Sequence, residues 1–213
     1  MKKYLVIAGI VMSLILSSCQ QLTWTLARFM GVRKPKVESK ETVFKFLDKI
    51  GQDTTDVYAL DTNLYNLFRN EPFKPDWDTG LRPIQIRVYD HAGEPVMQWA
   101  SCEGYLDDLK TFDSLPPRNY NGLNTSLKLQ EDINRYYTLE GSPANLFAPE
   151  GYDYYVLIYF ANWFPRQSKE SFSIIDQYVI DHPGLKFKIY KINMDVLDFW
   201  GYDDVITEES NFE

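Results

Sequence analysis

Two cysteines and two histidines are the side chains of this 213-residue sequence best suited to nucleophilic, redox or metal chemistry. Cys102 stands in the run Ser-Cys-Glu-Gly, where a predicted hairpin leads into a predicted helix. A helix N-terminus lowers the pKa of a thiol, whereas an acidic neighbour such as Glu103 raises it. Two interpretations stay open: Cys102 is a reactive thiol, or it is a small buried residue that fills space.

The histidines do not form a recognisable catalytic or metal set. His91 lies in a predicted turn and His182 precedes a proline. Two histidines and a single further thiol do not make a known zinc set, and neither histidine has a serine or cysteine close in sequence to serve as a nucleophile. We therefore expect surface or capping histidines, no bound metal and no cofactor.

The N-terminus predicts a secretion signal. Lys2 and Lys3 precede an apolar run from Leu5 to Leu16, which is too short to span a bilayer and leads into Leu-Ser-Ser-Cys. This ending resembles a bacterial lipobox, and the resemblance implies that Cys19 is lipidated and becomes the first residue of the mature, membrane-anchored chain. The alternatives are an ordinary signal peptide that contains a cysteine and an uncleaved anchor.

A lipid anchor predicts a protein of the bacterial cell envelope. Gln20 follows the cysteine in place of the aspartate associated with retention at the inner membrane, which favours the outer membrane. The segment 20–36 contains aromatic and basic residues but no acid, and is either an interfacial segment at the lipid headgroups or a plain tether. Because 22 basic residues stand against 30 acidic ones, for a formal net charge of -8, nucleic acid is not an expected partner.

The chain beyond the anchor has the size of one domain. We expect a signal peptide over 1–18, a membrane-proximal tether over 19–37 and a single domain over 38–213. The segment 113–153 is rich in turn-forming residues and is long for a loop, so we interpret it as an insertion or cover. Within it, apolar spacing predicts a helix over 125–137.

Two strands joined by a helix are predicted in the last third of the chain. The unbroken apolar run Tyr154–Phe160 is typical of a central strand that is covered on both faces. Pro165 suits the first position of a helix, and apolar residues then recur at helical spacing as far as His182. Lys186–Met194 follows as a second strand, which a crossover helix places parallel to the first.

The first half of the chain supplies the other elements. Its patterns predict helices over Glu41–Ile50, Asn63–Phe68 and Tyr105–Phe112. They also predict strands over Val57–Leu60, Ile84–Tyr89 and Val96–Ala100. The last two strands form a hairpin in which Gly93 is available for a positive φ angle.

The turn before the predicted crossover helix resembles the thioredoxin family. That family runs an apolar strand into aromatic-Ala-x-Trp-Cys-x-x-Cys, and a later strand ends in Lys-apolar-Asn-apolar-Asp. Here residues 159–167 read Tyr-Phe-Ala-Asn-Trp-Phe-Pro-Arg-Gln and residues 191–195 read Lys-Ile-Asn-Met-Asp. The two cysteines of the family fall on Phe164 and Gln167, and its buried proton-transferring acid falls on Ile158. Dithiol exchange needs an attacking thiolate and a resolving thiol, so the resemblance implies the fold without the activity.

The predicted hairpin gives a second resemblance to the same family. Pro83 takes the place of the cis-proline that lies beside the active-site turn in thioredoxins. In that family the proline and hairpin follow the cysteine turn, whereas here they precede it. Two explanations stay open: a permuted domain whose five predicted strands form one mixed sheet, or a thioredoxin-like unit built onto a different α/β frame.

We therefore expect an α/β domain with a thioredoxin-like three-layer arrangement and a mixed sheet of about five strands, acting as a binding module more than as an enzyme. The candidate binding surface for an unknown protein or peptide consists of Pro83, Trp163, Phe164, Arg166 and Gln167. At the helix start, Arg166 and Lys169 either hold an anion or are simply solvated. The alternative functions are a single-thiol redox protein that uses Cys102 and a structural component of the envelope.

Overall fold

The structure, a computed structural model, describes residues 31–60, 83–100 and 127–201. The expected signal peptide, the lipidation site Cys19 and the thiol of Cys102 lie outside these residues, as do the helices expected over Asn63–Phe68 and Tyr105–Phe112. Among the helices of the described segments, none combines the length and the apolar content needed to cross a bilayer.

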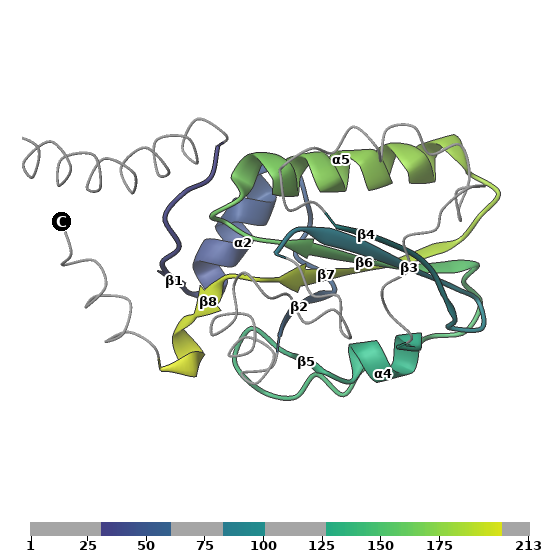
Figure 1. The fold of residues 1–213 in the computed structure, drawn as a ribbon, viewed down its shortest axis with the longest axis horizontal. Helices are drawn as coiled ribbons and strands as arrows, with labels where there is room; N and C mark the ends of the chain where they lie inside the picture. The colour runs from purple at the N-terminus through teal and green to yellow at the C-terminus, as the bar shows by residue number, and fades with distance from the viewer. Residues whose placement is uncertain (1–30, 61–82, 101–126, 202–213) are drawn as a thin grey trace, which may run out of the picture.

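A mixed β-sheet forms the centre of the structure (Figure 1). Its six strands lie in the order β4 (Pro95–Ala100), β3 (Gln85–Asp90), β6 (Tyr154–Phe160), β7 (Phe187–Asn193), β2 (Val57–Leu60) and β5 (Tyr136–Tyr137). Strand β7 is parallel to both of its neighbours, whereas the pairs β4–β3, β3–β6 and β2–β5 are antiparallel. All five strands expected from the sequence therefore belong to one sheet, and β5 is an additional sixth strand.

Strand β6 holds the layers of the domain together because its side chains alternate between two apolar clusters. Ile158 and Phe160 belong to the cluster beneath helices α2 (Lys40–Lys49) and α5 (Pro165–Asp181). Tyr159 belongs to the cluster on the opposite face, which helix α4 (Leu129–Ile133) covers. Figure 1 shows α2 and α5 on one side of the sheet and α4 on the other, which is a three-layer arrangement.

The helix expected after β6 is confirmed at both ends. Helix α5 begins with Pro165 at its first position and ends before His182. A proline is tolerated at that position because its missing N–H would have no partner inside the helix. The helix carries the chain from β6 to the parallel strand β7, and its residues Phe172 and Ile175 are buried against the sheet.

Helix α2 confirms the first predicted helix, with a shift of one residue. Its N-cap is Ser39, whose Oγ accepts a hydrogen bond from the backbone N–H of Thr42 at 3.4 Å. Thr42 Oγ1 in turn accepts from the backbone N–H of Ser39 at 2.9 Å, which completes a reciprocal cap. The helix stops before Gly51, which takes a φ angle of 82° that favours glycine.

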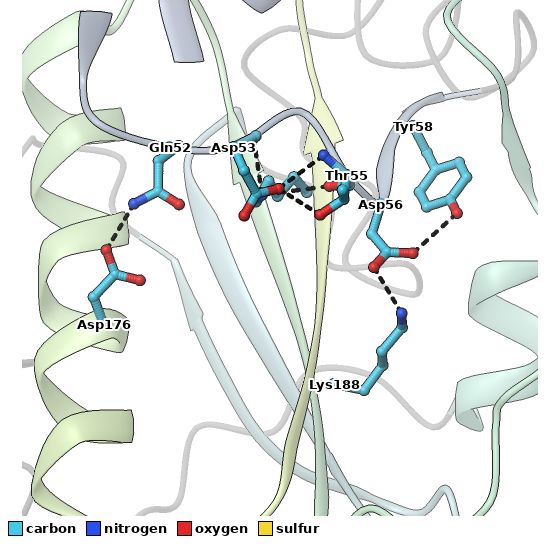
Figure 2. Close-up of polar contacts among 8 residues, drawn as sticks. Gln52, Asp53, Thr55, Asp56, Tyr58, Asp176 and Lys188 are labelled. Carbon is cyan, nitrogen blue, oxygen red and sulfur yellow. Dashed lines mark hydrogen bonds and ion pairs between the residues drawn. The ribbon is translucent and has the colours of Figure 1, made fainter. Parts of the chain in front are cut away.

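Ion pairs fix the loop between α2 and β2 against β7 (Figure 2). The buried Lys191 of β7 donates from Nζ to Asp53 Oδ1 over 2.7 Å. This hydrogen bond lowers the pKa of Asp53 to about 2. Lys188 of the same strand donates to Asp56 Oδ2 over 2.6 Å. The loop is therefore held beside the strand with which β2 pairs.

The helix expected over 125–137 proves shorter: 125–126 lie outside the described residues, and α4 spans only Leu129–Ile133. Helix α4 ends at Ile133, and β5 follows with Tyr136 paired to Leu60 of β2. The prediction was wrong for the last residues because Tyr136 satisfies the apolar spacing of a helix, yet its backbone pairs with a strand edge. Pairing between distant segments cannot be deduced from local periodicity.

A buried ionic network attaches α4 to the sheet. Asp132 of α4 accepts hydrogen bonds from Arg87 Nη1 and from the Tyr89 hydroxyl, both at 2.7 Å and both from β3. The Tyr136 hydroxyl donates to the other carboxylate oxygen at 3.0 Å and is also bonded to the hydroxyl of Tyr159. The carboxylate thus has several charged or polar donors, as a buried charge requires.

A small second sheet closes one end of the domain. Strand β1 (Val37–Glu38) lies parallel to β8 (Val196–Leu197), which follows β7 in the sequence. A single 3₁₀ turn, Asp198–Trp200, comes next, and Trp200 is buried in the same cluster as α2 and α5. The β1–β8 pair therefore joins a segment near the start of the described chain to one near its end, beside the β6–α5 turn.

Candidate functional site

The turn between β6 and α5 is fixed by hydrogen bonds from within its own segment. Ser168 on the first turn of α5 donates from Oγ to the carbonyl of Ala161 at 2.9 Å and accepts from the Ala161 N–H at 3.0 Å. The Phe164 N–H also donates to the Ala161 carbonyl at 3.1 Å. The backbone of this turn is therefore held in one arrangement at the end of the central strand.

Asp195 supports the same turn from the adjacent strand. Its carboxylate oxygens accept from the Asn162 N–H at 2.9 and 3.0 Å, and Asn193 Nδ2 donates to it at 2.7 Å. The contact is possible because β6 and β7 are parallel and paired in register, with Phe160 opposite Asn193, so both strands end at the same edge of the sheet. Asp195 is therefore a positioning residue for the turn.

The carboxyl group of Asp195 titrates close to neutral pH. It is only 1 % exposed, and this burial raises its pKa to about 7. Hydrogen bonds from Asn162, Asn193 and the Trp163 backbone act in the opposite direction, while the negative charge of Glu38 adds to the increase. Asp195 was not among the site residues predicted from sequence, although it ends the Lys-apolar-Asn-apolar-Asp pattern, which is the signal that marks it.

The N-terminal segment of the described chain packs on this turn. The Arg33 N–H donates to the Trp163 carbonyl at 2.7 Å. A methyl group added to Gly31 would lie 3.5 Å from Arg166 Cβ, so the two backbones run close together. The segment interpreted from sequence as a tether up to residue 37 thus contacts the domain from residue 31 onward.

The residues of the candidate binding surface occupy different environments. Trp163 and Phe164 are half-buried and lie with their ring centroids 4.3 Å apart. Arg166 is exposed, whereas Gln167 is only 4 % exposed and belongs to the buried side of α5. Accessible contacts in this turn therefore come from the aromatic pair and from Arg166.

Pro83 lies at the same end of the sheet as the turn. It precedes β3 by two residues, and Gln85 at the start of β3 pairs with Tyr159 near the end of β6. Extending this antiparallel register by two residues brings Pro83 level with Ala161. Strand pairing thus brings the proline and the turn, which are far apart in sequence, to one edge.

A basic pocket of about 330 Å³ opens beside the turn. Its walls are the segment before α2, the exposed face of α2 and the start of the β6–α5 turn. The lining residues are Arg33, Lys34, Lys36, Glu38, Thr42, Lys45, Phe46, Lys49, Asn162 and Trp163. The pocket is not evident from the sequence, because its charges come from two short segments that only the fold places opposite Trp163.

A second cavity of about 570 Å³ lies at the opposite end of β6. It is lined by His91 of the β3–β4 turn, by Tyr152 and Tyr155, and by both acidic and basic side chains. The other histidine, His182, is bonded through Nδ1 to the Tyr178 carbonyl at 2.8 Å. Within the segments that the structure describes, no group of three or more histidine, cysteine, aspartate or glutamate side chains could hold a metal ion.

Comparisons of the chain with family models, curated proteins and solved structures give no match. The turn offers backbone groups, an aromatic pair and an arginine, and the adjacent pocket offers cations. A carboxyl group that titrates near neutrality lies beneath them. The described residues at the turn include no thiol and no other nucleophile beside a base.

Proposed function

We propose that the chain is an envelope-anchored, redox-inactive thioredoxin-like lipoprotein that binds a protein or peptide partner. The observation that carries the proposal is the turn between β6 and α5, where Phe164 and Gln167 take the positions of the two cysteines of the family. Neither a phenyl ring nor an amide attacks or resolves a disulfide. The turn is nevertheless held rigidly by Ser168 and Asp195, as a recognition surface requires.

The strand arrangement supports a thioredoxin-like domain with permuted elements. The β3–β4 hairpin precedes the β6–α5–β7 unit in sequence but lies beside β6 in the same sheet. Pro83 lies at the edge where β6 runs into its turn, as the resemblance to the cis-proline of that family requires. Both halves of the family pattern thus meet in one domain, which favours permutation over a unit attached to a different frame.

The partner surface that we propose consists of Pro83, Trp163, Phe164 and Arg166, with Gln167 as a buried support. Aromatic and arginine side chains are enriched in the centres of protein interfaces, because they combine large apolar area with directional hydrogen bonding. Trp163 and Phe164 are half-buried, so they are already ordered and lose little conformational freedom on binding.

Site-specific photo-crosslinking in intact cells tests this partner surface. A photoreactive phenylalanine analogue at Arg166 should give a discrete protein adduct, because this side chain is exposed beside the aromatic pair. The matched control carries the same analogue at Lys128, which is exposed before α4 on the other side of the sheet. Identical adducts from both positions, or none from position 166, would argue against the surface.

A disulfide-reductase assay separates the proposal from the single-thiol alternative. Purified wild type and Cys102→Ser should both fail to turn over insulin disulfides in the presence of a thiol reductant. A measurable rate that disappears in Cys102→Ser would establish the redox alternative. A structural role in the envelope predicts no adduct at position 166 and stoichiometric co-purification with membrane components.

A further inference from the structure

The basic pocket concentrates positive charge in a chain that is acidic as a whole. Its cations are Arg33, Lys34, Lys36, Lys45 and Lys49. Its one acid, Glu38, is 4 % exposed and lies 3.5 Å from Lys36 Nζ. The formal net charge of the chain is -8, so this grouping departs from the average of the surface. A cavity with cationic walls attracts anions, and it does so more strongly at low ionic strength.

Helix α2 presents two of these cations on a rigid wall. Thr42, Lys45 and Lys49 recur at helical spacing and line the pocket from one face. Phe46 on the same face is buried and stacks against Phe160 of the central strand, with ring centroids 6.2 Å apart. Lys45 and Lys49 are exposed and, within the described residues, form no ion pair. Their charges are therefore available to a ligand.

One residue that lines the pocket, Asn162, has a buried side-chain oxygen, Oδ1, without a hydrogen-bond partner. A buried acceptor without a donor costs free energy, and rotation of the Asn162 amide toward the pocket would let a ligand hydroxyl group supply that donor. A matching ligand therefore combines an anionic group for the lysines and Arg33 with a hydroxyl group for Asn162. A phosphate esterified to glycerol has both, and arginine binds phosphate through two parallel hydrogen bonds.

We propose that the basic pocket binds the phosphoglycerol headgroup of an anionic phospholipid in the membrane that carries the anchor. The choice of a membrane lipid over a soluble phosphate ester as the ligand rests on the proposed lipidation of Cys19. Arg33 follows that cysteine by 14 residues, which span at most about 50 Å when fully extended. One wall of the pocket is thus part of the segment that leaves the bilayer. Binding of a headgroup in the pocket orients the β6–α5 turn, with Trp163, toward the membrane surface.

Vesicle co-sedimentation tests the proposal without depending on the acyl anchor. The chain from residue 19 carrying Cys19→Ser, which contains every described residue and cannot be acylated, is mixed with phosphatidylglycerol vesicles or with phosphatidylcholine vesicles. The test variant is Lys45→Gln with Lys49→Gln. The control variant, Lys128→Gln with Lys186→Gln, removes the same charge from exposed positions at the opposite end of β6, outside the pocket. Circular dichroism checks that each variant is folded.

Binding to phosphatidylglycerol vesicles should weaken about 30-fold in the pocket variant, because each lysine near an anionic surface contributes about 1 kcal/mol. The control variant should bind as wild type does, and phosphatidylcholine vesicles should bind neither. Equal losses in both variants, or equal binding to both lipids, would overturn the proposal. Binding of soluble glycerol 3-phosphate without vesicle binding would overturn the membrane source. Failure of Cys19 acylation would instead contradict the proposed anchoring, which this assay does not use.

Discussion

Arg87 Nη1 lies 2.7 Å from Asp132 Oδ2, and both side chains are almost completely buried between the sheet and α4. The guanidinium group also lies 5.3 Å from the centroid of the Tyr159 ring. Burial raises the pKa of Tyr89, whose hydroxyl is bonded to the same carboxylate, so this phenol stays neutral across the physiological range. The pair is a buried polar connection between α4 and β3.

Removal of the acid from this pair should destabilise the fold strongly. Asp132→Ala breaks the buried ion pair with Arg87, and removal of one partner of such a pair typically costs about 3–5 kcal/mol of unfolding free energy. Replacing both partners, with Arg87→Met and Asp132→Leu, should cost less than the single change because no charge remains buried. Urea unfolding monitored by tryptophan fluorescence measures both. A double variant less stable than Asp132→Ala would show that the pair itself favours folding.

The buried carboxyl of Asp195 should make stability depend on pH. Its pKa in the folded state is raised to about 7 from an ordinary value of 3.8, so between these values the folded state binds more protons than the unfolded state. Unfolding free energy therefore falls as pH rises through this window. Asp195→Asn removes that contribution, and its stability relative to wild type should rise by about 3 kcal/mol from pH 4.5 to pH 7.5. Urea unfolding at the two pH values checks this, and parallel profiles would contradict it.

Two glycines with similar backbone angles should respond differently to alanine. Gly141 and Gly151 have φ angles of 85° and 89°. A Cβ atom at Gly141 would lie 2.7 Å from Phe199 Cδ2, whereas one at Gly151 meets nothing within 4 Å. Gly151→Ala should cost about 1–2 kcal/mol for the strained backbone alone. Gly141→Ala should cost about 1–3 kcal/mol more, because Phe199 has to move. Equal losses of unfolding free energy in the two variants would show that Phe199 moves aside at no measurable cost.

Lipidation should depend on a single residue. Growth with labelled palmitate should label the wild-type protein and not Cys19→Ala, because the resemblance to a lipobox implies that Cys19 carries the lipid. The labelled protein should also partition with membranes after high-salt washing, since several acyl chains together anchor a protein firmly. Cys102→Ala serves as the matched control and should keep the label. Label that survives in Cys19→Ala would contradict the anchor.

Elements with a strong local pattern were predictable from sequence. The apolar run Tyr154–Phe160 is a strand with the predicted bounds, and Pro165 begins the predicted helix. Their types follow from hydrophobic periodicity and from the backbone preferences of proline, both of which act within a few residues. The sheet membership of Val57–Leu60 and the hairpin followed from the expectation of one mixed sheet.

Features that depend on contacts between distant segments were not predictable. Arg87 and Asp132 are charged residues that a sequence pattern assigns to the surface, and only the fold brings them together in the interior. The backbone of Tyr136 joins a strand edge although its spacing is helical. Lys45 and Trp163 line the same basic pocket although they lie far apart in the sequence. In each case the position of the residue is determined by an interaction with a residue that is distant in sequence.

The hydrogen bond from the Arg33 N–H to the Trp163 carbonyl has a mechanical consequence. A chain held by its N-terminus receives any load first through residues 31–33, before the load reaches β1 and the main sheet. Tension applied at the N-terminus would therefore break the contacts between residues 31–33 and the β6–α5 turn before it acts on the main sheet. In a chain anchored at its N-terminus, these contacts would couple the exposure of Trp163 to the distance between the domain and the membrane.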